Sequence, residues 1–388
     1  MRKMTTLLAL AAVVSFGAGA EAQTLKAVQD RGSLICGVNQ GLEGFGSKDD
    51  KGEWSGFDVD FCRALAAIIF NDPSKVQYVP LSAEARFDAL KNKQIDVLSR
   101  NSTWTIGREG DYGVAFPSTT YYDGQAFLVP KSRNVQSALE LDGSKVCVQP
   151  GTTTEPNFTD FFEANHMKYE VVHEGSAADM ITAYQAGQCN VMTTDESALF
   201  AIRQQLVKPG DSMILPDVIS KEPLGPVVRQ DDMQWFNIVK WVSFAMINAE
   251  ELGVSSKTID DALKSQKPAV KRLVGTEGDP GKPLGLSGDW AVRVVRAVGN
   301  YAEVFDRPND ARGPVAGKAE RLAEVTVRPD EPLDRRLLRL QRVIDRLRTD
   351  AELLGVDHGK MDPFHDVDPL QIILSHHWPQ GLLRDYVR

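Results

Sequence analysis

Apolar runs of strand length alternate with amphipathic runs of helix length along the first part of this chain. The first such runs predict strands at residues 34–38, 76–79 and 95–98 and helices at residues 58–70 and 84–91, with Asp58 as the expected N-cap of the first helix. Regular alternation of strands and helices is typical of α/β domains with mostly parallel sheets. The sequence therefore predicts an α/β fold.

The same alternation begins again near Gln125, which indicates a second α/β unit. Its expected elements are strands at 125–130, 146–149 and 191–194 and helices at 155–165 and 177–186; a strand at 226–229 and helices near 233–250, 256–263 and 290–305 follow. We predict two lobes with a ligand cleft between them. Residues 23–124 and 223–306 would form the first lobe, and residues 125–222 the second.

The first 22 residues have the pattern of a signal peptide. Arg2 and Lys3 supply positive charge, residues 5–16 are almost wholly apolar, and Ala20-Glu21-Ala22 offers small residues at a cleavage position. The apolar run is shorter than the roughly 20 residues that span a bilayer, so cleavage is favoured over an uncleaved anchor. We expect export to the periplasm.

The formal net charge is −9, and the main body of the chain has no basic cluster. This distribution argues against nucleic acid and anionic lipid as partners.

Four cysteines in an exported chain suggest two disulfides, because the periplasm is oxidising. Four cysteines allow three connectivities, and four buried free thiols are the alternative. Cys36 and Cys147 lie in expected strands, while Cys62 falls early in the first helix and Cys189 lies just before a strand. This placement favours Cys36–Cys62 and Cys147–Cys189. None of the four has the spacing of a metal site.

Three segments carry groups that suit a free amino acid: residues 98–108, residues 151–155 and Thr194-Asp195-Glu196. An amino acid presents a carboxylate and an ammonium on one carbon. The planar guanidinium of Arg108 suits the carboxylate, and the carboxylate of Asp195 suits the ammonium. Ligands of open α/β sheets bind beyond the carboxyl ends of the strands, where both residues are expected.

The chain resembles the periplasmic solute-binding proteins of polar amino-acid ABC transporters. The motifs that carry the resemblance are Gly56-Phe57-Asp58-Val59-Asp60, the loop from Ser99 to Arg108, the segment Phe116–Tyr122 and Gly151-Thr152-Thr153. Trp104, Ser220–Arg229 and Ala245–Gly253 are similar to the general L-amino-acid-binding subgroup. The resemblance covers about residues 23–306 and implies the two-lobed type II periplasmic-binding-protein fold.

The resemblance also implies roles for individual residues. Arg108 would bind the α-carboxylate with help from Thr103 and the backbone N–H of Thr153. Asp195 would accept from the α-ammonium, assisted by the backbone of Asn101. The competing interpretations are a solvated Arg108 and an Asp195 that caps a helix.

Three further residues are expected at the walls of the ligand site. Thr152 belongs to the loop of the second lobe, and Phe45 ends the glycine-rich loop that would line the side-chain pocket. Trp104 is expected to pack against the cleft wall. The loop from residue 39 has no large aromatic before Phe45, which fits a roomy, weakly selective pocket.

Residues 307–388 form an atypical tail beyond the resemblance. They contain 12 Arg and 2 Lys, whereas residues 1–306 contain 12 Arg and 18 Lys. Leucines, Ile344 and Ala351 recur at alternating spacings of three and four between residues 337 and 354, which predicts an amphipathic helix at about 333–354. A single helix is favoured over a dimerising coiled coil, so we expect a monomer. The four tail histidines (His358, His365, His376, His377) lack the spacing of a metal site.

These observations predict a binding protein that needs no cofactor or metal and delivers L-amino acids, with broad specificity, to an inner-membrane ABC permease. We find no nucleophile–base pair and no dinucleotide-binding fingerprint in the sequence, either of which would indicate an enzyme. The alternatives are a periplasmic dehydratase on the same fold, for which Glu43 or Glu155 would have to act as the acid, a sensor, or a damaged paralogue.

Overall fold

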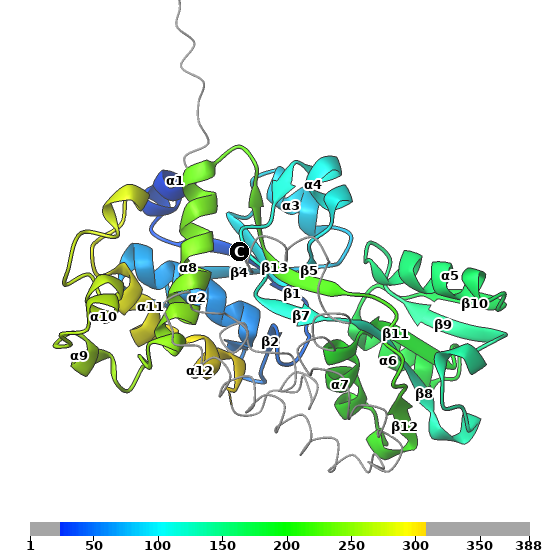
Figure 1. The fold of residues 1–388 in the computed structure, drawn as a ribbon. Helices are drawn as coiled ribbons and strands as arrows, with labels where there is room; N and C mark the ends of the chain where they lie inside the picture. Colours follow the sequence, from blue (N-terminus) through cyan, green and yellow to red (C-terminus); the bar gives the residue numbers. More distant parts are fainter. Residues whose placement is uncertain (1–23, 308–388) are drawn as a thin grey trace, which may run out of the picture. The chain divides into compact units, whose positions relative to one another are not determined.

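The computed structural model describes residues 24–307 of the 388-residue chain. They form a six-stranded sheet, a five-stranded sheet and a two-stranded ribbon, with helices packed on the sheets (Figure 1). The expected signal peptide and the expected tail helix at about 333–354 lie outside the described residues and stay predictions.

The first sheet has the strand order β4-β1-β5-β13-β6, and β7 also pairs with β13. Its strands are β1 (Leu34–Asn39), β4 (Val76–Leu81), β5 (Val97–Thr103), β6 (Val114–Ala115), β7 (Tyr121–Asp123) and β13 (Glu222–Arg229). β1 is parallel to β4 and β5, whereas β13 runs antiparallel to its three partners. The sheet is therefore mixed rather than wholly parallel.

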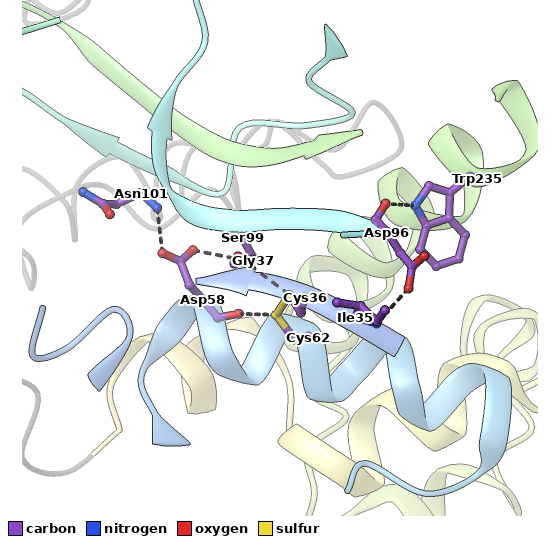
Figure 2. Close-up of a disulfide and its surroundings, with 9 residues drawn as sticks. All are labelled: Ile35, Cys36, Gly37, Asp58, Cys62, Asp96, Ser99, Asn101 and Trp235. Carbon is purple, nitrogen blue, oxygen red and sulfur yellow. Dashed lines mark hydrogen bonds between the residues drawn. A yellow bond between two sulfur atoms is a disulfide. The ribbon is translucent and has the colours of Figure 1, made fainter. Parts of the chain in front are cut away.

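Nine helices accompany this sheet among the described residues. They are α1 (Thr24–Arg31), α2 (Phe57–Phe70), α3 (Arg86–Lys91), α4 (Ile106–Tyr112), α8 (Met233–Glu251), α9 (Ile259–Ala262), α10 (Pro268–Leu273), α11 (Trp290–Val298) and α12 (Tyr301–Phe305). α11 packs against α2 and α8, and their apolar faces fill one core with β1. Trp235 of α8 is buried there and donates its indole N–H to the carbonyl of Asp96 over 2.9 Å (Figure 2).

The second sheet has the order β10-β9-β11-β8-β12. Its elements are β8 (Gln125–Pro130), β9 (Ser144–Val148), β10 (Tyr169–His173), β11 (Val191–Asp195), β12 (Ser212–Ile214), α5 (Thr154–Ala164), α6 (Ala177–Gln185) and α7 (Glu196–Gln205); the ribbon is β2 (Ser47–Lys48) and β3 (Trp54–Ser55). Alternate residues of β8 enter two different apolar clusters, with Phe127 in one and Leu128 in the other. The two clusters therefore lie on opposite faces of the sheet.

The chain passes between the two sheets twice, through adjacent strands. β7 ends at Asp123 just before β8 begins, and the return path enters the first sheet at Glu222, the first residue of β13. Glu222 and Asp123 are register partners in the antiparallel β7–β13 pair. Two carboxyl groups therefore lie where the chain crosses, that of Glu222 buried and that of Asp123 half-buried.

Both disulfides have the pairing that the placement of the cysteines favoured. Cys36 of β1 is bonded to Cys62 of α2, as Figure 2 shows, and Cys147 of β9 is bonded to Cys189 before β11. All four are buried. Each disulfide thus covalently links a strand to a neighbouring element within one sheet unit.

Asp58 was predicted to be the N-cap of the first helix, and this prediction is wrong. The N-cap is Gly56, which has a φ of 125°, and no side chain caps α2. The carboxylate of Asp58 turns instead to β5 and accepts from the backbone N–H of Asn101 (2.7 Å) and the hydroxyl of Ser99 (3.2 Å), as Figure 2 shows. β5 extends to Thr103, beyond the predicted strand, and so brings donors that bind the Asp58 carboxylate in place of the N–H groups at the start of α2.

The single helix predicted over residues 290–305 is two helices. Gly299, with a φ of 93°, separates α11 from α12. Asn300 then begins α12 with a capping box, in which its side chain accepts from the N–H of Glu303 and Glu303 accepts from the N–H of Asn300.

No helix within residues 24–307 has both the length and the apolar character needed to cross a membrane.

Replacing Gly56 by alanine should destabilise the protein by about 3 kcal/mol, because backbone strain and a steric overlap add together. The added Cβ would lie 2.3 Å from the carbonyl oxygen of Phe45. Gly52→Ala is the matched control, since Gly52 also has a positive φ (84°) but no atom within 4 Å of its added Cβ. Urea unfolding measures both variants. Equal losses of stability would show that the approach to Phe45 does not constrain α2.

Candidate functional site

Eleven residues from both sheets line one pocket. The lining is Arg86, Arg100, Asn101, Thr103 and Arg108 from the first sheet and its helices, and Gln149, Thr152, Thr153, Thr154, Thr194 and Asp195 from the second. The pocket encloses about 290 Å³ of empty space, part of which is open to solvent.

Arg108 is held by its own loop. Thr105, the N-cap of α4, accepts from the backbone N–H of Arg108 (3.2 Å), and the Arg108 guanidinium donates to the carbonyl of Thr103 (2.7 Å). The guanidinium also lies 5.1 Å from the centroid of the Phe87 ring. Arg108 is only 8% exposed, and this burial lowers the pKa of its guanidinium. The solvated interpretation of Arg108 is therefore wrong, since its side chain is buried beside a pocket.

Two more buried arginines line the pocket, and sequence reasoning missed both. Arg100 donates to the carbonyl of Leu81 (2.9 Å), and its burial lowers the pKa of the guanidinium to about 10. Arg86 donates to the carbonyl of Gly151 (3.2 Å), while its Nε has no partner among the described residues. Burial, and then the charges of Arg100 and Arg108, lower the pKa of Arg86 well below its usual value. The pocket thus has an excess of buried cations on its first-sheet side.

Asp195 faces these cations from the end of β11. It occupies the N-cap position of α7, but its side chain makes no capping hydrogen bond. Burial raises the pKa of Asp195 well above its usual value, and the charges of Asp123 and Glu222 act in the same direction. The charges of Arg108 and Arg86 oppose this shift. The Asp195 carboxyl group is therefore available to the pocket rather than used to cap α7.

Asn101 has an unusual backbone conformation, with a φ of 27°. Its N–H donates to Asp58 and its side-chain oxygen accepts from the amide of Asn39 (2.9 Å). These bonds hold a sparsely populated conformation at the pocket wall. Such conformations often occur at ligand sites.

The loop before α5 and the first residue of that helix bring three threonines to the pocket. Thr152 donates to the carbonyl of Gln149 (2.7 Å), and the hydroxyl oxygen of Thr153 lies 3.4 Å from that of Thr103. Gly151 has a φ of 73°, and a Cβ there would lie 2.9 Å from the Cα of Glu84. Glycine therefore permits the close approach of this loop to the first-sheet side.

The structure brings most of the expected ligand residues together, with two exceptions. The ones that line the pocket are Arg108, Asp195, Thr103, Thr153, Asn101 and Thr152. Phe45 is absent from this lining because it is buried in the core, with edge contacts to Phe57 and Tyr121. Trp104 is also absent from the lining; it stacks on Phe116 and is 40% exposed.

Two further acids lie near the crossing strands. Asp123 accepts from the backbone N–H of Gly124 (2.8 Å) and from the hydroxyl of Ser197. Burial raises the pKa of Asp123 to about 6 and that of Glu196 to about 7. The residues described by the structure include no group of three acidic, histidine or cysteine side chains placed to hold a metal ion.

A pocket with guanidinium groups on one side and a carboxyl group on the other suits a small molecule that carries both charges. Bidentate arginine contacts favour a carboxylate, and a buried carboxylate favours an ammonium group. The site is therefore suited to recognise the opposite charges of a small ligand.

The family model of bacterial extracellular solute-binding proteins, family 3, matches residues 34–258, from the start of β1 to the residue before α9. The chain belongs to this family. The matched range contains every residue that lines the pocket.

Similar proteins of known name are transport binding proteins rather than enzymes. The general L-amino acid-binding periplasmic protein AapJ of Rhizobium johnstonii is 51% identical over 300 residues, which cover 76% of this chain and 88% of AapJ. The glutamate/glutamine/aspartate/asparagine-binding protein BztA of Rhodobacter capsulatus is 49% identical over 299 residues, covering 77% of this chain and 88% of BztA.

A solved structure confirms the fold of this family 3 protein. The ABC transporter periplasmic binding protein from Brucella ovis with glutathione bound has a TM-score of 0.73 and 47% identity. The match covers 76% of this chain and 93% of the Brucella chain. The type II periplasmic-binding-protein fold expected from the sequence is thus confirmed.

The stability of the protein should rise as the pH falls from about 8 to about 5.5. Asp123 and Glu196 bind protons more tightly in the folded state, since their pKa values are raised to about 6 and about 7 by burial. The unfolded chain ionises both groups already above about pH 5, so the folded state is favoured wherever it alone holds the proton. Urea unfolding across this window tests the expectation.

Asp123→Asn and Glu196→Gln should each make the unfolding midpoint less dependent on pH. An unchanged slope in both variants would show that these carboxyl groups do not titrate in this window.

Proposed function

We propose that this family 3 solute-binding protein binds free L-amino acids and delivers them to an ABC-type permease. The observation that carries the proposal is one pocket lined by two oppositely charged buried groups, Arg108 (8% exposed) and Asp195 (6% exposed). Such a pair matches the two charged ends of an amino acid.

In the proposed complex the fork of Arg108 binds the α-carboxylate, and the backbone N–H of Thr153 contributes a second donor. Asp195 binds the α-ammonium together with the backbone carbonyl of Asn101. Each ligand charge then meets a buried partner, which strengthens the interaction because little water competes.

We further propose that the two sheets belong to two lobes, residues 23–124 with 223–306 and residues 125–222, which close around the ligand. Two observations at the pocket support closure: Arg86 donates to the carbonyl of Gly151 (3.2 Å), and the hydroxyl oxygens of Thr103 and Thr153 lie 3.4 Å apart. The adjacent crossing strands β7 and β13 are the place for the hinge. The protein would act in the periplasm after cleavage of residues 1–22.

The names of the relatives support a broad range of amino-acid ligands. AapJ is named for general L-amino acids and BztA for two acidic amino acids and their amides. The Brucella ovis protein holds glutathione, which adds γ-glutamyl compounds to the ligands worth testing.

Calorimetric titration of the refolded protein with L-amino acids, their D-enantiomers and glutathione tests the proposal. Refolding removes ligand carried over from the cell. We expect one-to-one binding of several chemically different L-amino acids, with discrimination against their enantiomers. Failure of every L-amino acid to bind would overturn the proposal.

Arg108→Met should weaken binding of every L-amino acid by about 2–5 kcal/mol, because it leaves the buried α-carboxylate without its charged partner. The matched control is Arg133→Met, since Arg133 donates to Ser144 and Asn190 and is not among the pocket residues. Calorimetry compares both variants with the parent. Wild-type affinity in Arg108→Met would refute the proposed role.

Arg86→Met should reduce the preference for acidic ligands. Arg86 is a buried cation whose Nε has no partner among the described residues, so it favours any ligand that brings a second negative charge. We expect affinity for L-aspartate and L-glutamate to fall about tenfold further than affinity for L-asparagine and L-glutamine. Equal losses for acids and amides would assign Arg86 a role in holding Gly151 alone.

A further inference from the structure

Glu222 is a buried carboxyl group that does not line the pocket, yet it touches residues that do. It is only 2% exposed and stands at the start of β13, where the chain returns to the first sheet. Neither the sequence motifs nor the proposed ligand contacts assign it a role.

Four donors from different parts of the chain surround this carboxylate. Its Oε2 accepts from the hydroxyls of Thr103 (2.6 Å) and Thr153 (2.9 Å). Its Oε1 accepts from the side-chain amide of Asn157 (2.8 Å) and the hydroxyl of Ser220 (2.5 Å). Each oxygen of this buried carboxylate therefore accepts two hydrogen bonds.

These contacts join the two sheets behind the pocket. Thr103 belongs to β5 of the first sheet, whereas Thr153 and Asn157 belong to the start of α5 beside the second sheet. One carboxylate therefore links the two sides of the pocket through hydrogen bonds to charged oxygen, which are stronger than bonds between neutral groups.

The same contacts decide which way the two threonine hydroxyls point. A carboxylate can only accept, and a hydroxyl has one proton, so Thr103 and Thr153 both give their proton to Glu222. The two hydroxyl oxygens, 3.4 Å apart, then keep only lone pairs for other partners. Both threonines line the pocket, so they offer it acceptors. An ammonium group, with three protons, fits such acceptors, and a carboxylate does not.

We propose that Glu222 is a positioning residue. It turns the hydroxyl oxygens of Thr103 and Thr153 into acceptors for the ligand's ammonium group and holds β5 and α5 together around that group. The inference rests on the proposed function, and it assigns the polarity of the site to a residue outside the pocket.

The test is a mutational cycle read by calorimetry with an L-amino acid that the parent binds. Glu222→Gln keeps the shape of the side chain but replaces one acceptor oxygen by a donor, so one pair of neighbours loses its acceptor. We expect Glu222→Gln to weaken binding about tenfold. In a background that carries Thr103→Val and Thr153→Val, the same change should alter affinity less than about twofold, because the hydroxyls through which it acts are gone.

The matched control is Asp217→Asn. Asp217 accepts from the hydroxyl of Ser137 (3.1 Å) and the backbone N–H of Ala138 (2.9 Å) and is not among the pocket residues. It should alter thermal stability and leave ligand affinity unchanged. The control shows what loss of a structural carboxylate does to binding.

Two results would overturn the inference. One is an affinity of Glu222→Gln equal to that of the parent. The other is that Glu222→Gln reduces affinity by the same factor with and without the threonine hydroxyls, which would indicate a structural role. If Glu222→Gln does not fold, the variant with both threonines replaced by valine carries the test. It removes the hydroxyls and keeps Glu222, and we expect about a tenfold loss. Unchanged affinity there refutes the inference. A parent that binds no amino acid refutes the proposed function itself, and the inference with it.

Discussion

The site depends on the burial of opposite charges at one place. Arg86, Arg100 and Arg108 are each less than 10% exposed, and desolvation is the largest cause of the lowered pKa of each guanidinium. Isolated, such groups would oppose folding, because a buried charge is costly without partners. The acids across the pocket reduce that cost. Asp195, one of these acids, is itself desolvated by burial, which raises its pKa. A ligand that carries both charges gives the buried guanidinium groups an anionic partner and the buried carboxyl group a cationic one.

The strands at which the chain crosses between the sheets carry two of the acidic groups near the pocket. β7 and β13 run side by side, and their register sets Asp123 opposite Glu222. Asp123 binds the start of α7 through Ser197, and Glu222 binds the start of α5 through Thr153 and Asn157. The segments that connect the sheets thus also fix the helix starts that border the pocket. A movement of one sheet relative to the other would necessarily change these hydrogen bonds.

Sequence periodicity predicted the strands and helices well because each buries one face along a regular repeat. The place of Arg108 and Asp195 at the pocket was also predictable, since both come at or after the carboxyl end of a strand-like run. Arg86, Arg100 and Glu222 were not, because the burial of a charged side chain depends on partners far along the chain. Arg100 lies in the part of β5 that was expected to be a loop, where alternation gives no signal. Asp58 was assigned to its own helix for the same reason: its donors on β5 lie more than 40 residues away.

Where the polar groups lie also bears on selectivity. Arg108, Asp195, Thr103 and Thr153 can all bind atoms that every amino acid shares. Local hydrogen bonds fix Arg108, and Glu222 fixes the two threonine hydroxyls. Binding energy concentrated on shared atoms gives similar affinities for different side chains, and specificity is only the difference between affinities. Of the lining residues, Arg86 has a buried donor with no partner among residues 24–307, so discrimination among side chains should depend most on charge. If the proposed function holds, a pocket arranged in this way would accept many L-amino acids and rank them mainly by the second charge they bring.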